Sequence, residues 1–220
     1  PVLCEKAFAL DSAQAREIVE VARRKNVFLM EALWTRFLPS FLEGKRLVES
    51  GIVGQPSSIS TDFGFVSPYA PERRLWDPAM GGGTLLDIGL YPLFFALQML
   101  GPVMDIEVDW TPAPNGVDRR VRIQAVHRNG AKSDSLASFD ENLQCKSTLE
   151  GTAGKLVFER MFHTPTDLSI TDDQGTTRAI PIPREGFGYQ HETIHVGNCL
   201  REGLLESPLW PISSTMELME

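Results

Sequence analysis

The chain opens with a strand, a helix and a second strand, and this order constrains the fold more than any other feature. Residues 2–4 are an apolar run, apolar side chains recur at helical spacing from Ala15 to Ala22 behind a cap at Asp11 or Ser12, and Val27–Leu33 is β-branched and aliphatic. Two strands joined by a helix lie parallel, because the helix carries the chain back to the same end of the sheet. The sequence therefore predicts one parallel crossover unit at its start.

A parallel sheet of two strands would leave its edges exposed and bury almost no core. We therefore expect the rest of this sheet to come from residues that are not in the sequence, which amounts to an amino-terminal truncation.

Beyond Pro39 the apolar pattern changes its period. A helix is expected from Pro39 to Gly51. Alternation of the kind seen at Ile59, Thr61 and Phe63 then recurs at residues 106–110 and 121–125, which is typical of strands with one buried face.

Two turn signals and two helical blocks complete the pattern. Asn129-Gly130 is a strong hairpin signal and Asp173-Gln174-Gly175 is a weaker one. Helices are expected at residues 83–100 and at about 189–202. The predicted fold class is α+β: a large, mostly antiparallel open sheet of about six strands, flanked by helices and preceded by the last strand-helix-strand of a Rossmann-type domain.

Composition narrows the classes of function. The net charge is −8 with no basic run, which disfavours a nucleic-acid surface or a membrane patch. Leu85–Leu100 is too short and too interrupted for a bilayer span. Cys4, Cys145 and Cys199 are an odd number at wide spacing, so we expect neither a disulfide framework nor a zinc site, and a cytoplasmic protein fits best.

The stretch Gly81-Gly82-Gly83-Thr84-Leu85-Leu86-Asp87-Ile88-Gly89-Leu90-Tyr91 is the richest in candidate chemistry. Its glycines permit close approach of a backbone or ligand, and Asp87 and Tyr91 lie one helical turn apart on one face. A structural interpretation is also open: Thr84 and Asp87 have capping-box spacing, and Tyr91 fits a core aromatic. Pro92 is expected to disturb this helix.

Lys6 follows the first parallel strand, and Trp34 and Arg36 follow the second. Open α/β sheets bind ligands at the carboxyl ends of their strands, so these residues are expected on one rim. An ion pair for Arg36 and a core position for Trp34 are equally open. Trp76 is a candidate wall of a substrate pocket or a cover for a loop.

Metal binding is not expected. Of the four histidines, only His191 and His195 have helical i, i+4 spacing, and Glu192 is the single acidic residue beside them.

Three motifs in order resemble the glucose-fructose oxidoreductase and inositol dehydrogenase family over essentially the whole chain. They are Val2-Leu3-Cys4-Glu5-Lys6, Met30-Glu31-Ala32-Leu33-Trp34-Thr35-Arg36-Phe37-Leu38-Pro39 and the stretch from Gly81 to Tyr91. The form with tyrosine in the last motif is most similar to the dimeric dihydrodiol dehydrogenases.

The resemblance implies roles for particular residues. Lys6 maps onto the catalytic lysine of the family, Asp87 and Tyr91 map onto its acid and its histidine or tyrosine, and Glu5, Lys6, Trp34 and Arg36 fall where the family lines its nicotinamide site. Independently of the resemblance, Trp76 would contact substrate as an apolar wall that suits a ring-bearing diol or sugar. The implied cofactor is NAD or NADP, with NADP favoured.

The resemblance also implies a domain division and an oligomer. Residues 1–37 would be the terminal part of a dinucleotide-binding domain, and residues 38–220 a domain for substrate binding and oligomerisation, with a homodimer formed through the sheet face. Two departures stand out: Ala7 replaces the usual proline after Lys6, and no G-x-G-x-x-G occurs in the sequence.

The resulting hypothesis is a fragment of an NAD(P)-dependent oxidoreductase that transfers hydride between a nicotinamide cofactor and a secondary alcohol or ketone of dihydrodiol or sugar-like structure. Tyr91 would act as acid and base with help from Lys6, and the fragment alone would be inactive. Two alternatives are a non-catalytic sugar- or dinucleotide-binding regulator of the same fold and a module for dimerisation only.

Overall fold

Residues 185–220 pack with the start of the chain rather than with the segment that precedes them. The computed structural model describes residues 1–220 and divides into one unit of Pro1–Leu38 and Glu185–Glu220 and a second of Pro39–Arg184. The predicted division instead assigns all of residues 38–220 to one domain. The difference arises because Ile212 joins the apolar core of the first unit, a long-range contact that local pattern does not reveal. The functional roles of the two units stay predictions.

The first unit contains the predicted parallel crossover. Strands β1 (Val2–Glu5) and β2 (Leu29–Ala32) pair in parallel, and helix α1 (Ser12–Lys25) connects them. The Asp11 side chain caps the helix by accepting from the backbone N–H of Gln14 at 2.8 Å. One side of α1 is apolar and packs with Phe8, Leu29 and Ile212 in a single cluster.

Two further helices complete this unit. Helix α4 (Tyr189–Arg201) packs on the 3-10 turn η1 (Trp34–Phe37), and α5 (Ile212–Met219) packs on α1 and β2. The backbone of Leu205 accepts from the N–H of Leu29 at 3.0 Å and so covers part of the free edge of β2. Helix α4 was predicted within a residue or so, whereas α5 was not predicted.

The second unit is built on an eight-stranded sheet in the order β10-β9-β8-β7-β3-β6-β5-β4. All neighbours are antiparallel except β3 and β6, so the predicted large, mostly antiparallel sheet is confirmed. The strands are β3 (Pro56–Gly64), β4 (Val103–Pro112), β5 (Asp118–His127), β6 (Lys132–Ser138), β7 (Ser147–Gly151), β8 (Gly154–Phe158), β9 (Leu168–Asp172) and β10 (Thr177–Ile180).

Both predicted hairpins are present, joining β5 to β6 and β9 to β10. The prediction of about six strands did not include β7 and β8, which form a further hairpin. Each of these two strands is five residues long, and the turn between them, Thr152-Ala153, lacks the asparagine-glycine signal.

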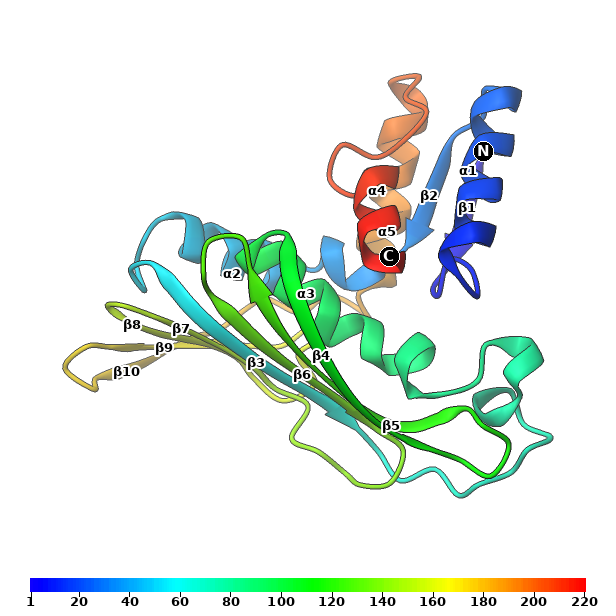
Figure 1. Ribbon diagram of the computed structural model, residues 1–220. Helices are drawn as coiled ribbons and strands as arrows, with labels where there is room; N and C mark the ends of the chain where they lie inside the picture. Colours follow the sequence, from blue (N-terminus) through cyan, green and yellow to red (C-terminus); the bar gives the residue numbers. More distant parts are fainter. The chain divides into compact units, whose positions relative to one another are not determined.

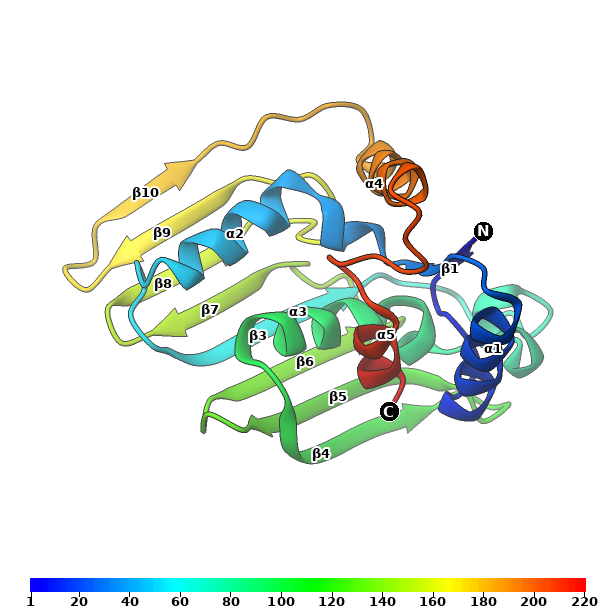
Figure 2. The same cartoon turned by 90° about the horizontal axis from the view of Figure 1, so that it is seen from above.

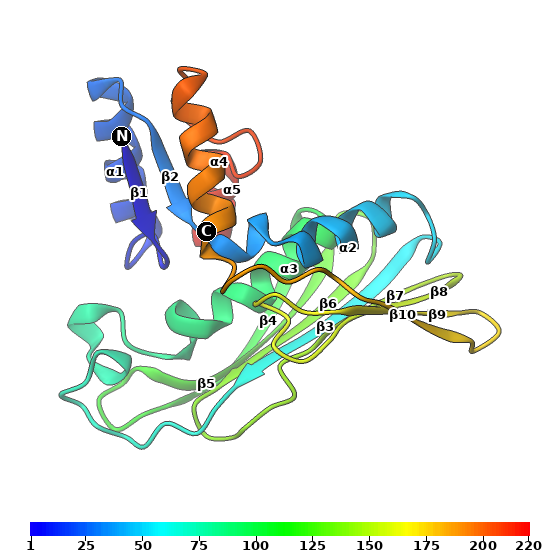
Figure 3. The same cartoon turned by 180° about the vertical axis from the view of Figure 1, so that it is seen from behind.

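Helices cover one face of this sheet. In Figure 1, α2 (Pro39–Glu49) and α3 (Leu90–Leu100) lie on the same side, and Figure 2 shows α2 over β8 and α3 over β3 and β6, in agreement with their contacts. Within this unit no helix lies on the other face, as the view in Figure 3 also shows. By register, that open face carries polar side chains such as Ser60, Arg122 and Asp134.

An aromatic cluster holds the helices to the sheet. Phe95 of α3 packs edge-on against Phe158 of β8 at 4.8 Å and against Phe162 at 4.9 Å between ring centroids. Phe41 of α2 lies 4.7 Å from Phe94. These rings are almost completely buried, and buried aromatic pairs of this geometry stabilise beyond their area alone, by about 0.5–1.5 kcal/mol each.

The edge strand β4 is not covered by these helices. By register, one face of β4 lies beside the side chains of β5 that point toward the helices. The β4 side chains on that face are nevertheless exposed: Ile106 by 58%, Val108 by 48% and Trp110 by 51%. The reason is that α3 packs over β3 and β6, farther into the sheet.

One helical stretch, Pro78–Leu100, is long and apolar enough to cross a membrane by length and composition. Of its apolar 18-residue segment, however, 67% is buried inside the protein. This is the behaviour of a core helix, and it agrees with the packing of α3 on the sheet.

Two helical glycines give a matched test of this packing. A Cβ added at Gly44 of α2 would lie 2.2 Å from the ring of Phe158, whereas one at Gly197 of α4 would meet nothing nearer than 3.6 Å. Gly44→Ala should therefore destabilise by about 1–3 kcal/mol through overpacking, while Gly197→Ala should stabilise by about 0.5–1 kcal/mol. Urea unfolding of both variants measures this, and equal effects of the two substitutions would contradict the packing described.

Candidate functional site

Asp118 of β5 fixes the start of the helix that carries the candidate residues. Its Oδ2 accepts from the Thr84 hydroxyl at 2.5 Å and from the backbone N–H of Leu85 at 2.6 Å. Gly83 has a φ of 113°, and an added Cβ there would lie 2.1 Å from Asp118. Glycine is thus required at position 83 for both its conformation and its space. The capping box is one of two open interpretations of this stretch, and the Thr84 side chain does not form it, because it makes no capping hydrogen bond. Asp118 accepts from the first N–H of the helix instead.

The helix begins with a π turn. Residues Leu85–Gly89 are π-helical, with the N–H of Leu90 bonded to the carbonyl of Leu85, before α3 continues from Leu90. Pro92 lacks the N–H that an α-helix would direct at Ile88, which agrees with the expected disturbance. Single π turns inside helices are frequent at functional sites.

Asp87 lies in this π turn with its side chain buried. Its Oδ1 accepts from Nη2 of Arg74 at 2.8 Å, and the residue is 8% exposed. The arginine is itself more than half exposed. The contact therefore holds a carboxylate in position at the end of a surface loop.

Tyr91 lies among aromatic rings. It is 5% exposed, and its ring centroid is 5.8 Å from Phe63 and 5.3 Å from His163. His163 is also buried and stacks on Phe63 at 4.1 Å. The phenol ring thus belongs to a buried cluster of rings that includes an imidazole not predicted as a site residue.

Trp76 covers a loop in this structure. It is 2% exposed, its indole N–H donates to the Ser67 hydroxyl at 3.3 Å, and it packs edge-on against Tyr69 and Phe139. This is the second of the two roles considered for it. Contact with substrate stays a prediction.

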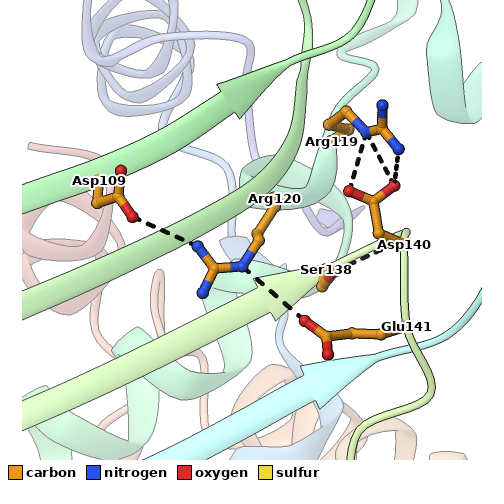
Figure 4. Close-up of polar contacts among 6 residues, drawn as sticks. All are labelled: Asp109, Arg119, Arg120, Ser138, Asp140 and Glu141. Carbon is orange, nitrogen blue, oxygen red and sulfur yellow. Dashed lines mark hydrogen bonds and ion pairs between the residues drawn. The ribbon is translucent and has the colours of Figure 1, made fainter.

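The arginines next to Asp118 are paired with carboxylates (Figure 4). Arg119 binds both oxygens of Asp140 at 2.5–2.9 Å. Arg120 contacts Asp109 at 3.4 Å and Glu141 at 3.9 Å. Because acidic groups balance these positive charges, this end of the sheet does not form a basic patch.

The other candidate residues all belong to the first unit. Trp34 and Arg36 lie in η1 directly after β2, where they are 7% and 6% exposed. Trp34 stacks on Tyr189 of α4 at 4.2 Å. Burial and, second, the charge of Arg36 lower the pKa of His195 in α4. Lys6 follows β1 and is partly buried, while Glu5 is exposed.

Glu192 is a buried carboxyl at this rim. It lies in the first turn of α4, is 5% exposed, and its Oε2 has no hydrogen-bond partner. Burial and, second, the negative charge of Glu5 raise the pKa of Glu192 to about 7. An unpaired buried carboxyl oxygen is uncommon and calls for an explanation. A hydrogen-bond donor on a bound ligand would provide one.

The structure thus gathers the predicted residues in two groups. Glu5, Lys6, Trp34 and Arg36 belong to the first unit, and the second holds Trp76, Asp87 and Tyr91. Contact between Lys6 and Tyr91 would join the two units, and it stays a prediction. Sequence reasoning missed three residues of these surroundings: Tyr189, Glu192 and His163. Of these, only Glu192 gave a signal, a carboxylate on the helix predicted at residues 189–202.

Comparisons with known proteins agree with the resemblance seen in the motifs. Residues 41–157 match the GFO/IDH/MocA C-terminal domain. The chain is 31% identical over 229 residues to trans-1,2-dihydrobenzene-1,2-diol dehydrogenase of Mus musculus, an alignment that covers 100% of this chain and 67% of the mouse enzyme.

Solved structures share the fold. A 3-ketoreductase from Actinomadura kijaniata in complex with NADP superposes with a TM-score of 0.84 at 21% identity, covering 100% of this chain and 68% of that one. Levoglucosan dehydrogenase with NADH and levoglucosan gives 0.85 at 20% identity, covering 99% and 68%. The chain therefore spans about two thirds of the length of these relatives.

The chain belongs to the GFO/IDH/MocA family of NAD(P)-dependent oxidoreductases. The predicted family, the class of enzyme and the class of cofactor are thereby confirmed, and the fold class is confirmed as well.

Glu192 makes stability depend on pH in a defined direction. A carboxyl whose pKa is about 7 when folded, and about 4 when unfolded, stabilises fully below about pH 4, and this contribution is lost as the pH rises through 7. Glutamine at position 192 does not titrate. The free energy of unfolding of Glu192→Gln minus that of the wild type should therefore be larger at pH 8 than at pH 5, by up to about 2 kcal/mol after solvent screening. Thermal unfolding at both pH values measures this.

The matched control is Glu20→Gln, at an exposed carboxylate on α1 of the same unit. It should change stability equally at pH 5 and pH 8. A pH-independent effect of Glu192→Gln would show that Glu192 is ionised in the folded protein throughout this range.

Proposed function

We propose that this chain supplies the proton-transfer side chains of an NAD(P)-dependent dehydrogenase that interconverts a secondary alcohol and a ketone. The observation that carries the proposal is the buried phenol of Tyr91, which lies in the first turn of α3, directly after the π turn Leu85–Gly89 that contains the Asp87 carboxylate. The names of the relatives, a dihydrodiol dehydrogenase and a levoglucosan dehydrogenase, support a cyclic diol or sugar-like substrate.

Tyr91 would act as the general acid and base on the substrate oxygen. The pKa of free tyrosine, about 10, is too high for this role at neutral pH. A nearby ammonium lowers the pKa of a phenol, and Lys6 would supply that charge. Asp87, held by Arg74 at 2.8 Å, would orient the substrate hydroxyl or the lysine.

The rim of the first unit fits the nicotinamide end of the cofactor. The stacked rings of Trp34 and Tyr189 would provide a flat surface there. The unpaired Oε2 of Glu192 would accept a hydrogen bond from the amide of the nicotinamide. The cofactor would supply the hydride chemistry when bound. Residues 1–220 contain no G-x-G-x-x-G loop, so the pyrophosphate would be bound by a region outside them.

The choice between NAD and NADP belongs to that region too, and we favour NADP from the family resemblance. All three cysteines are free thiols, which supports a reducing compartment such as the cytoplasm.

Removing the Tyr91 hydroxyl tests the proposal. In the complete enzyme, Tyr91→Phe should lower kcat by about 10²-fold or more, because general acid–base catalysis contributes that much. Tyr69→Phe, at a tyrosine that is 41% exposed, is the matched control and should leave kcat unchanged. Steady-state kinetics with a trans-dihydrodiol and a sugar-like alcohol measure both variants, and wild-type turnover by Tyr91→Phe excludes this role for Tyr91.

We also propose that two copies associate through the open face of the eight-stranded sheet. This face carries the partly buried Leu136 between polar neighbours, and its charges are paired within the chain, as in the contact of Arg122 with Asp134 at 2.5 Å. Paired charges cost less to bury in an interface than isolated ones.

Equilibrium sedimentation of matched variants tests this association. Leu136→Asp should shift the wild-type dimer toward monomer, because it places an unpaired charge in the proposed interface. Ile106→Asp introduces the same charge at a residue that is 58% exposed on the other face of the sheet, and it should leave the dimer intact. A monomeric wild type, or dissociation by Ile106→Asp alone, would rule out this interface.

A further inference from the structure

Asp118 of β5 contacts, from the sheet, the helical segment that carries Asp87 and Tyr91. Its Oδ2 accepts from the Thr84 hydroxyl and from the N–H of Leu85, which lie 34 and 33 residues before it in the chain. The N–H groups at the start of a helix have no partner within the helix, and hydrogen bonds to a carboxylate are about twice as strong as those between neutral groups. One oxygen of a strand residue therefore binds both donors at the start of the segment.

The residues around Asp118 leave its carboxylate to these two donors. Arg119 and Arg120, the next two residues of β5, bind other acidic side chains, as Figure 4 shows. The loop before the helix fits closely against Asp118, since a Cβ added at Gly83 would lie 2.1 Å from its Oδ1. The N–H of Gly83 in turn donates to the carbonyl of Leu75 at 2.9 Å. This glycine thus allows the loop to contact the strand closely.

The far end of the same segment is anchored by aromatic rings. Phe95 of α3 packs edge-on against Phe158 of β8, with 4.8 Å between ring centroids. Between this anchor and Asp118 lies the π turn, in which the N–H of Leu90 donates to the carbonyl of Leu85. A π turn holds one residue more than a regular helical turn. Because both ends of the segment are fixed to the sheet, the helix cannot slide along its axis to remove the extra residue.

We propose that Asp118 is a positioning residue: it ties the start of the segment to β5, maintains the π turn and so fixes the positions of Asp87 and Tyr91. The inference rests on the proposed function, in which these two side chains act on the substrate. A cap from a residue beside the helix would fix the helix only to its own loop, and the Thr84 side chain makes no such cap. A cap from a strand fixes the helix to the sheet. A displacement of about 1 Å can slow a reaction by about 10²-fold, so this connection affects the chemistry.

Hydrogen exchange tests the positioning without turnover. In the full chain, the Leu90 amide reports on the π turn, and the Leu156 amide of β8, a completely buried residue between β7 and β9, reports on global unfolding. Asp118→Ala removes both hydrogen bonds and should raise the exchange rate of Leu90 about tenfold more than that of Leu156. Equal increases at the two amides would mean that Asp118 contributes only to global stability, and the proposal fails.

Kinetics of the complete enzyme give a second readout. Asp118→Ala should lower kcat about tenfold or more and change KM by less than about threefold, because misplaced proton-transfer groups slow the chemical step more than they weaken binding. Ile170→Ala is the control: it leaves a cavity at a buried residue of β9 and lowers the melting temperature, but it should leave kcat at the wild-type value. An equal fall in kcat for both variants would overturn the proposal.

Asp118→Asn separates the position of the acceptor from the loss of stability. Its side-chain carbonyl oxygen can still accept from the N–H of Leu85, so this variant should recover most of the kcat that Asp118→Ala loses. A kcat as low as that of Asp118→Ala, together with wild-type exchange at Leu90, would contradict a positioning role.

Thr84→Val covers the case in which Asp118→Ala does not fold. It removes one of the two hydrogen bonds, so it should raise the exchange rate of Leu90 and lower kcat, each by about threefold. Thr215→Val is its matched control, because it removes a buried hydroxyl that donates to Glu31 at 3.0 Å in the first unit; it should change neither quantity. Wild-type exchange and kcat in Thr84→Val would overturn the proposal.

The two readouts also separate this inference from the proposed function. Wild-type turnover by Tyr91→Phe would refute the proposed reaction and leave the exchange result at Leu90 as measured. Faster exchange at Leu90 with unchanged kcat in Asp118→Ala would refute the positioning role and leave the proposed reaction standing.

Discussion

The packing of α3 on the sheet is the interaction on which the second unit depends. Phe95 contacts both Phe158 in β8 and Phe162 just after it, so one ring fixes the helix to the strand and to the loop that follows. That loop also carries His163, whose ring lies 5.3 Å from Tyr91. The apolar contacts that stabilise the unit therefore also determine which groups surround the phenol.

Polar contacts fix the start of the same helical segment. Asp118 caps it from the sheet, and the π turn at Leu85–Gly89 adds one residue before the regular helix begins. The turn changes the relation between Asp87 and Tyr91 that a regular α-helix would impose, because an added residue rotates one side chain relative to the other. Arg74, from the loop before the helix, donates to Oδ1 of Asp87 at 2.8 Å. The position of the carboxylate thus depends on a strand, a loop and a proline.

Local pattern was enough to predict the crossover unit, the antiparallel sheet and most helices, because each repeats its apolar period over several residues. Contacts between distant segments were not predictable. Glu31 meets Trp210 and Thr215 across 179 and 184 residues, and Asp118 replaces a capping residue predicted three positions into the helix. His163 follows a short strand with no spacing signal, and Trp76 is buried by two rings outside its own segment. The candidate residues came from motifs, whereas the groups that hold them came from tertiary structure.

An ammonium that acts by its charge must be both held in place and kept protonated. A lysine side chain loses about 2 kcal/mol of rotamer entropy when it is fixed, so its loop has to be rigid for the charge to have a constant effect. Burial near an apolar core opposes that charge, since desolvation favours the neutral amine. The adjacent strand carries a buried carboxylate: Glu31 of β2 is 1% exposed, and its register partner on β1 is Cys4, two residues before Lys6. Burying an acid is unfavourable, and two donors offset this at Glu31: the indole N–H of Trp210 at 3.2 Å and the hydroxyl of Thr215 at 3.0 Å.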